Sequence, residues 1–183
     1  MLTWQGLQQF DPGNGTFRTI SSDYRFLTVH EDRQGLLWFG TLDDGLMRYE
    51  RDTETLTHYP PNPDDPHGLQ DASVSQILET VDGSFWIGTW YGGLHRFDRE
   101  IEQFFPYQHD PENLAGISHN EIDCLFEDSR GILWVGTADG LNRYHPESDS
   151  FTLYHRQDGL AGTYIYAILE DEGGVVFFHA YLC

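Results

Sequence analysis

Short apolar runs alternate with glycine-rich polar segments along the whole chain. In the clearest example, the run SVSQILET is followed by Asp82-Gly83 and then by the run SFWIGT. Asp-Gly supplies the positive backbone angles of a tight hairpin turn, and runs rich in Val, Ile, Phe, Tyr and Trp are typical of strands. Two more runs, GLHRFDR and QFFPYQ, follow. The pattern therefore predicts a meander of four short antiparallel strands.

The same group of runs recurs at a fixed spacing. Trp38, Trp86 and Trp134 lie 48 residues apart. They stand in the similar phrases LLWFGTLDDGLMRY, SFWIGTWYGGLHRF and ILWVGTADGLNRY. A fixed period of about 20–50 residues indicates a repeat architecture. Each repeat is therefore expected to form one small sheet.

The strands carry adjacent apolar residues, such as Ile77-Leu78, rather than strict alternation. Apolar side chains on both faces indicate that each sheet is packed between two others. Four-stranded sheets packed face to face around an axis form a β-propeller. We therefore predict an all-β fold, a β-propeller of four-stranded antiparallel blades. A linear stack is the alternative, but such a stack needs capping units.

The chain is expected to form a single repeat domain over residues 1–183, with about four blades' worth of strands. It begins with strands matching the third and fourth of a unit and ends with strands matching the first and second. Phe177 stands at the tryptophan position and His179-Ala180 at the Gly-Thr position. We expect a fragment of a larger ring, and the alternative is a small closed ring in which the terminal half-blades pair. The predicted segments are a half blade at 1–22, blades at 23–60, 72–108 and 119–156, and a degenerate half blade at 163–183.

Composition narrows the range of partners. The chain has 10 basic against 30 acidic residues, a net charge of −20, which disfavours nucleic acid and anionic membranes. No segment has the roughly 20 apolar residues of a membrane helix. The opening MLTWQGLQQFDP lacks the basic and apolar regions of a signal peptide. Cys124 and Cys183 do not form a disulfide framework, and Cys124 is expected in the core.

The phrases LFEDSRGILWVGTADGLNRYHPESDSFTLY and ILETVDGSFWIGTWYGGLHRFDREIEQFFPY resemble the two-component regulator propeller repeat. The resemblance extends from Thr3 to about Phe177. It implies a sensor propeller of the kind found in periplasmic regions of histidine kinases, hybrid two-component regulators and some diguanylate cyclases. Many such sensors detect oligosaccharides. The output kinase domain would then lie in a longer parent protein, since no kinase motif occurs in this chain.

The repeated residues are interpreted as structural. The three tryptophans are expected to pack between blades, because the large indole side chain buries much apolar area. The glycines two residues later are expected to let neighbouring chain segments approach closely, and the adjacent threonines to satisfy backbone groups at the strand end. Asp32, Asp82 and Asp128 are interpreted as turn formers. The glycines are Gly40, Gly88 and Gly136, and the threonines are Thr41, Thr89 and Thr137.

Function is expected where the units differ, in loops on a repeated scaffold. Trp4, Trp90 and Tyr91 are aromatic where other units have small or polar residues. An aromatic ring with a polar group suits stacking on a sugar or peptide, so these three are the candidate ligand-binding residues. The alternative is packing beneath a loop.

Other site types are not indicated by the sequence. Asp43 and Asp44 lack the spacing of a calcium loop, and the nine histidines lack zinc-ligand spacing, so no metal and no cofactor are predicted. His67, His109 and His119 lie in loops between units and could line a propeller face.

No catalytic motif is present, so the chain is not expected to be an enzyme. Two alternatives stay open: a stand-alone interaction scaffold, and a carbohydrate-active enzyme with a carboxylate pair. Self-association through open sheet edges is also possible.

Overall fold

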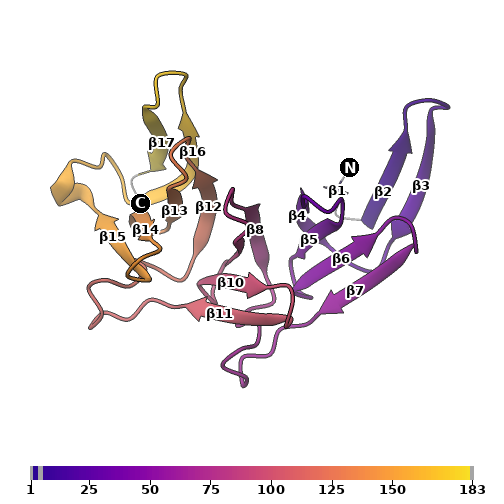
Figure 1. Ribbon diagram of the computed structural model, residues 1–183, viewed down its shortest axis with the longest axis horizontal. Helices are drawn as coiled ribbons and strands as arrows, with labels where there is room; N and C mark the ends of the chain where they lie inside the picture. Colours follow the sequence, from indigo (N-terminus) through magenta and orange to yellow (C-terminus); the bar gives the residue numbers. More distant parts are fainter. Residues whose placement is uncertain (1, 4–5, 182–183) are drawn as a thin grey trace.

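The computed structural model describes residues 2–3 and 6–181. These residues form five antiparallel sheets arranged as an arc (Figure 1). The first sheet contains β1 (Leu2–Thr3), β2 (Gly6–Asp11) and β3 (Thr16–Ser21). The last contains β16 (Tyr164–Glu170) and β17 (Val176–Tyr181). The all-β propeller architecture expected from the sequence is thus present.

Three complete four-stranded blades lie between these two sheets. Blade 1 consists of β4 (Phe26–Glu31), β5 (Leu37–Thr41), β6 (Leu46–Glu50) and β7 (Thr55–Tyr59). Blade 2 consists of β8 (Val74–Glu79), β9 (Phe85–Thr89), β10 (Leu94–Asp98) and β11 (Gln103–Tyr107). Blade 3 consists of β12 (Ile122–Glu127), β13 (Leu133–Thr137), β14 (Gly140–His145) and β15 (Ser150–Tyr154). A short 3₁₀ turn, η1 (Arg156–Asp158), follows blade 3.

The first strand of each unit lies on the inner side of the arc. β4 contacts β8, β8 contacts β12 and β12 contacts β16, so the inner strands adjoin one another around the arc (Figure 1). Each inner strand also shifts its pairing register by one residue near its start, a β-bulge that recurs in all four units. The bulged residues are Leu27, Ser75, Asp123 and Tyr166.

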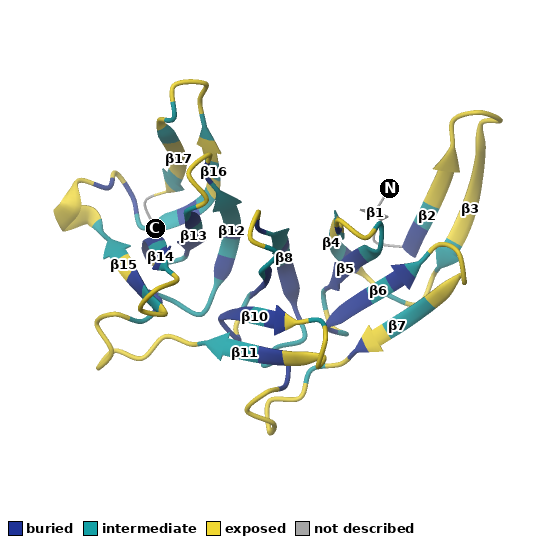
Figure 2. Ribbon diagram, in the orientation of Figure 1, coloured by how far each residue is buried: buried dark blue, intermediate teal, exposed yellow. Residues whose placement is uncertain are grey.

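The core lies between blades rather than within them. Figure 2 shows the buried strands in the middle of the arc and exposed ones at its two ends. Trp38 and Trp86 are 0% and 2% exposed, each in a cluster with residues of the following blade. Trp134 is only partly buried. It packs at the interface with the last sheet, which has no third or fourth strand among the described residues.

The repeated glycines lie where the next inner strand approaches. A Cβ atom on Gly40 would come within 2.3 Å of the Val74 carbonyl oxygen. One on Gly136 would come within 2.4 Å of both the Ile165 carbonyl oxygen and the Cys124 sulfur. Such distances are far below contact, so a side chain at these positions would push neighbouring blades apart.

Two kinds of hydrogen bond recur at every junction between blades, one at each end of the strands. After the second strand, the turn glycine donates its N–H to a carbonyl just before the next unit: Gly45 to Ala72, Gly93 to Asn120 and Gly140 to Thr163. At the opposite end, a turn N–H donates to the glutamate that ends the next inner strand: Arg33 to Glu79, Val81 to Glu127 and Ser129 to Glu170. The blades are therefore joined in a constant register.

The chain does not close into a ring. Within residues 2–3 and 6–181, the first and last sheets do not pair with each other, and they stand at opposite ends of the arc (Figure 1). The structure is therefore a partial propeller, as expected, and not the small closed ring that was the alternative. The first sheet also has a short strand, β1, that the repeat comparison did not anticipate; it pairs Leu2 with Leu7 and Thr3 with Gly6.

Candidate ligand-binding face

One face of the arc combines the turns after the second strands with the connections between blades. In each blade the residue after the repeated threonine donates its N–H to the carbonyl just before the inner strand: Leu42 to Arg25, Trp90 to Ser73 and Ala138 to Glu121. The threonine hydroxyls donate to the turn glycine carbonyls at 2.8, 2.8 and 3.1 Å, which confirms their expected backbone role. These bonds recur in all three blades, although the turn of blade 3 is one residue shorter than the other two.

Trp90 and Tyr91 occupy the turn of blade 2 on this face. Tyr91 is 71% exposed, and Trp90 is half-buried. Their backbone is fixed at both residues, since Trp90 N–H donates to Ser73 O at 3.1 Å and Tyr91 N–H to Asp71 Oδ2 at 2.9 Å. Gly92 follows, where a Cβ would meet the Asp71 Cβ at 2.7 Å. The two aromatic side chains therefore project from a well-held turn.

Polar side chains surround this turn. Asp71 precedes blade 2, and Asn120 precedes blade 3. Gln108 donates from Nε2 to the Gly92 carbonyl at 3.4 Å, and Asn120 Oδ1 accepts from the His109 N–H at 2.7 Å. An aromatic pair beside carboxylate and amide groups can stack on a flat apolar face and hydrogen-bond to hydroxyls. Trp4, the third candidate residue, lies outside the described residues.

The inner rim of the same face carries a cluster that the sequence pattern did not reveal. Tyr164 Oη lies 2.8 Å from Glu121 Oε1 and 3.0 Å from Asp123 Oδ1, to which it can donate. Burial raises the pKa of Asp123 to about 6, with the Glu121 charge adding to the effect and the Tyr164 bond opposing it. Burial, followed by the bonds to the two carboxylates, raises the pKa of Tyr164. The three residues come from adjacent units, so only the register between blades brings them together.

The histidines named from the sequence have different surroundings. His67 is exposed, and its ring lies 5.1 Å from that of Phe105. His109 Nδ1 bonds to the Ile117 carbonyl at 2.9 Å, and His119 Nδ1 accepts the Glu121 N–H at 3.0 Å. The described residues bring these three into no metal-binding cluster, nor do they contain any other group of three or more potential ligands.

His95 is a buried histidine that the sequence analysis did not single out. It is 0% exposed, and its Nε2 accepts the Gln70 N–H at 3.2 Å. Burial lowers the pKa of His95 to about 4. Asn142 holds the corresponding position in blade 3, where it bonds the Ser118 N–H and hydroxyl. This position therefore ties a connection between blades to the third strand.

The aspartates interpreted as turn formers divide into two kinds. Asp32 and Asp128 are buried and accept backbone N–H groups of the hairpin turn. Each also accepts from the indole of its blade's tryptophan, at 2.8 and 3.1 Å. Asp82 lies two positions later than these, within its turn. Thr80 takes the equivalent position in blade 2 and donates to Asp82 at 2.6 Å. Asp43, which the sequence analysis considered for a calcium loop, forms an ion pair with Arg25.

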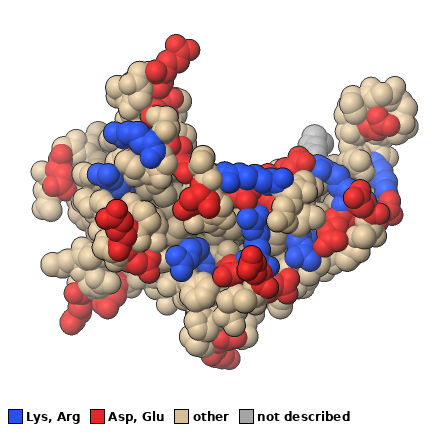
Figure 3. Space-filling model, in the orientation of Figure 1, with Lys and Arg blue, Asp and Glu red and all other residues tan. Residues whose placement is uncertain are grey.

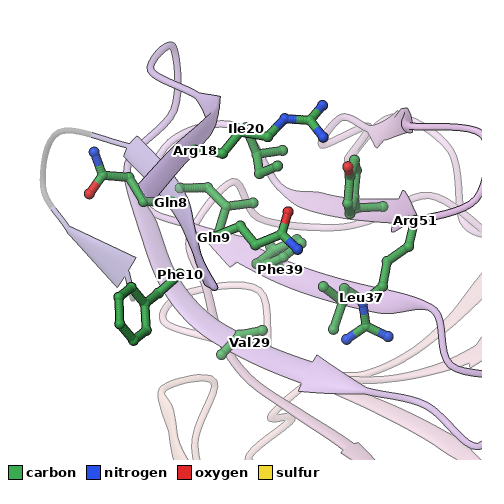
Figure 4. A pocket seen from close by; sticks show the side chains of 11 residues that line it. Gln8, Gln9, Phe10, Arg18, Ile20, Val29, Leu37, Phe39 and Arg51 are labelled. Atoms are coloured by element: carbon green, nitrogen blue, oxygen red, sulfur yellow. The ribbon is translucent and has the colours of Figure 1, made fainter. Parts of the chain in front are cut away.

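The cavities lie away from the two aromatic residues. One of about 580 Å³ opens between the connection after blade 2 and the outer strand β15, and its lining includes His109, Asp139 and Phe151. Another, of about 470 Å³, lies between the first sheet and blade 1 (Figure 4). In Figure 4 Gln9 points into that cavity and the ring of Phe10 points away from it. Trp90 and Tyr91 line neither of these two cavities.

Charge on the surface is acidic and dispersed. All ten basic residues are arginines, and Figure 3 shows them mixed with carboxylates on the visible face, with no broad basic patch there. The described residues include no helix with the length and hydropathy to cross a membrane.

The repeats are similar to those of a known protein family. Residues 19–43, 68–91 and 116–139 match the two-component regulator propeller family. The match recurs once for each complete blade. The first matched stretch begins near the end of β3, and the other two begin in the connections before the inner strands. All three end in the turn after the second strand, where Trp90 and Tyr91 lie in blade 2. No curated protein matches the sequence.

Solved structures share this fold at low sequence identity. The extracellular domain of a one-component system from B. thetaiotaomicron is 19% identical, with a TM-score of 0.76; the alignment covers 97% of this chain and 24% of that one. The extracellular domain of a hybrid two-component system from the same organism is 20% identical, with a TM-score of 0.58, covering 98% and 30%. A virginiamycin B lyase from Staphylococcus aureus is 14% identical, with a TM-score of 0.68, covering 96% and 56%. The chain spans about a quarter to a third of the two sensor domains, and these likenesses show the fold.

Proposed function

We propose that this chain is a ligand-sensing segment of a two-component-type sensor, and that it binds an oligosaccharide through Trp90 and Tyr91. The observation behind the proposal is the exposed Tyr91 beside Trp90 on a turn whose backbone is held by Asp71 and Ser73. A site built on rigid backbone loses little conformational entropy when a ligand binds. Aromatic rings can cover the apolar face of a sugar ring, while Asp71, Gln108 and Asn120 offer groups for its hydroxyls.

Similar proteins support a proposal for where this site acts. The repeats match the two-component regulator propeller family, and two solved neighbours are extracellular domains of one-component and hybrid two-component systems. We infer a periplasmic location in a longer parent protein, whose output kinase domain would respond to binding here. Binding can shift the parent between states only if the ligand prefers one of them. We further propose that the ligand is bound without being chemically changed.

A thermal-shift screen against a panel of oligosaccharides tests the ligand site. A sugar that raises the melting temperature of the wild-type chain should lose that effect in Trp90→Ala and in Tyr91→Ala. Val81→Ala is the matched control, because Val81 is 74% exposed in a turn at the opposite end of the strands. If the shift persists in both aromatic variants, the site is elsewhere. Release of new products from a bound sugar would contradict binding without chemical change.

A further inference from the structure

The connection between blades 2 and 3 borders an open cavity on the same face as the two candidate aromatic residues. Its volume is about 580 Å³, which is within the range of small-molecule sites. Its walls come from that connection, from the turn after β13, from β15 and from the residue that follows β15. The first and last sheets contribute no described residue to the lining. The cavity is therefore a feature of the complete blades.

The two connections between complete blades follow the same path along the outer strand of the next blade. In blade 2 the Phe104 N–H donates to the His67 carbonyl at 2.9 Å. In blade 3 the Phe151 N–H donates to the Ala115 carbonyl at 2.8 Å. His67 and Ala115 therefore hold equivalent places in the two connections.

The side chains at the equivalent places differ in size. Phe105 and Thr152 correspond, because each pairs with the arginine of the third strand in its blade. In blade 2 the rings of His67 and Phe105 contact each other, with 5.1 Å between their centroids. Blade 3 has Ala115 and Thr152 instead, and Thr152 lines the cavity. The space that two rings fill in blade 2 is therefore open in blade 3.

The cavity is linked to the aromatic turn of blade 2 through shared residues. Gln108 donates from Nε2 to the Gly92 carbonyl at 3.4 Å, and the next residue, His109, lines the cavity. The His109 N–H bonds to Asn120 Oδ1 at 2.7 Å, and the Asn120 carbonyl accepts the Gly93 N–H at 3.0 Å. The turn and the cavity wall are therefore held in a fixed relation, and one extended molecule can contact both.

The lining offers several groups that bond to hydroxyls. Asp110 and Asp139 supply carboxylates, and Asn113 supplies an amide. His109 donates from Nδ1 to the Ile117 carbonyl at 2.9 Å, so its neutral ring presents Nε2 as an acceptor. Carboxylate, amide and imidazole groups around one cavity suit a ligand with many hydroxyls.

The charge of the lining narrows the ligand further. The described residues that form the lining include two aspartates and no arginine. Like charges repel, so a uronic acid or a sulfated sugar is disfavoured there. Leu114, also in the lining, is 88% exposed and offers apolar surface to the face of a sugar ring. The cavity therefore favours a neutral sugar.

We propose that this cavity is a second subsite of the ligand site, and that the ligand is a neutral oligosaccharide long enough to occupy both. The inference rests on the proposed function, because Trp90 and Tyr91 hold one part of the same ligand. Sugar units beyond the aromatic turn enter the cavity and bond to Asp110, Asp139 and Asn113. The bound ligand thus crosses the junction between blades 2 and 3.

Isothermal titration calorimetry with neutral gluco-, xylo- and manno-oligosaccharides of increasing length is the first test. In a series that binds, affinity should rise about tenfold once the sugar is long enough to enter the cavity. Oligogalacturonates of the same lengths should show no such rise. A binding series whose affinity does not depend on length would overturn the second subsite, and an equal rise for the acidic series would overturn the neutral ligand.

Thr152→Phe tests the cavity by introducing the residue that blade 2 has at this position. It should abolish the gain in affinity with length and leave the binding of short sugars unchanged. Thr57→Phe is the matched control, because Thr57 pairs with the third-strand arginine of blade 1 and lies outside the cavity lining. Circular dichroism of both variants establishes that the blades have folded.

Asp139→Ala is a second variant that changes only an exposed side chain in a turn. It should lower the affinity for long sugars about tenfold, because a hydrogen bond to a charged group is lost. Asp44→Ala is its control, since the N–H of Asp44 bonds to the repeated threonine of blade 1 as that of Asp139 does in blade 3. Equal affinities of the two variants for long sugars would contradict the subsite.

Trp90→Ala distinguishes failure of this inference from failure of the proposed function. It should remove the binding of sugars of every length. If it does so while Thr152→Phe and Asp139→Ala bind long sugars as the wild type does, the aromatic site stands and the cavity is not a subsite. If the wild type binds no sugar of any length, the proposed function fails and this inference fails with it.

Discussion

The interface between blades 1 and 2 and the interface after blade 3 use the same repeat, but they differ in completeness. Trp38 is fully buried, bonded to Asp32 and surrounded by three aromatic rings. Trp134 has the same bond to Asp128 and, among the described residues, a single ring contact. The local sequence around the two residues is nearly the same. The difference therefore shows that the following sheet, rather than the repeat itself, determines how deeply each tryptophan is buried.

Truncating the two tryptophans measures that difference directly. Trp38→Ala removes a fully buried ring and should cost about 4 kcal/mol of unfolding free energy, whereas Trp134→Ala should cost about half as much. Urea denaturation followed by circular dichroism gives both values. Equal losses would mean that the neighbouring sheet adds little to the repeat.

His95 offers a comparison between blades that depends on pH. Its pKa is lowered by burial to about 4, below the ordinary value near 6.5. The unfolded chain therefore binds more protons between these values, and stability is lost as the pH falls from about 6.5 to about 4. The expected contribution is about 3 kcal/mol across that range.

His95→Asn, which introduces the residue found at this position in blade 3, is the matched variant. Its loss of stability in acid should be smaller than that of the wild type by that amount. Asp123 titrates with the opposite sign, because its pKa is raised to about 6, so the difference between the two proteins is the quantity to measure. Parallel pH profiles for the wild type and the variant would exclude this role for His95.

The glycines give the smallest expected effect. Gly136→Ala would place a Cβ 2.4 Å from the Ile165 carbonyl oxygen and should cost about 2 kcal/mol through overpacking. Gly173→Ala is the control, because its nearest neighbour is the flexible Asp171 side chain at 3.2 Å. Thermal melting of the two variants compares them. Similar melting temperatures would show that the blades can separate slightly without loss.

Much of this architecture was predictable from the sequence, because period and turn chemistry are local signals. The spacing of Trp38, Trp86 and Trp134 indicated one sheet per repeat, and Asp82-Gly83 marked a hairpin. The arrangement of Tyr164 with Glu121 and Asp123 was not predictable, since it depends on how adjacent units align in space. The sequence also did not reveal that Thr80 replaces the buried aspartate in blade 2. Asp82 resembles a turn former in sequence, and only the structure shows which position accepts the indole bond.

The two recurrent kinds of hydrogen bond between blades differ in their acceptors. On the face that carries Trp90 and Tyr91, backbone joins backbone, as between Gly93 and Asn120. On the opposite face the acceptor is a glutamate side chain with rotatable bonds, as in the bond from Val81 N–H to Glu127. We expect adjacent blades to rotate about the backbone hydrogen bonds on the face that carries Trp90 and Tyr91, because those bonds leave less freedom than bonds to a side chain. A molecule that bridges two adjacent turns on this face would shift the turns by a short distance. The opposite face, where the glutamates accept, would then open or close by a larger distance.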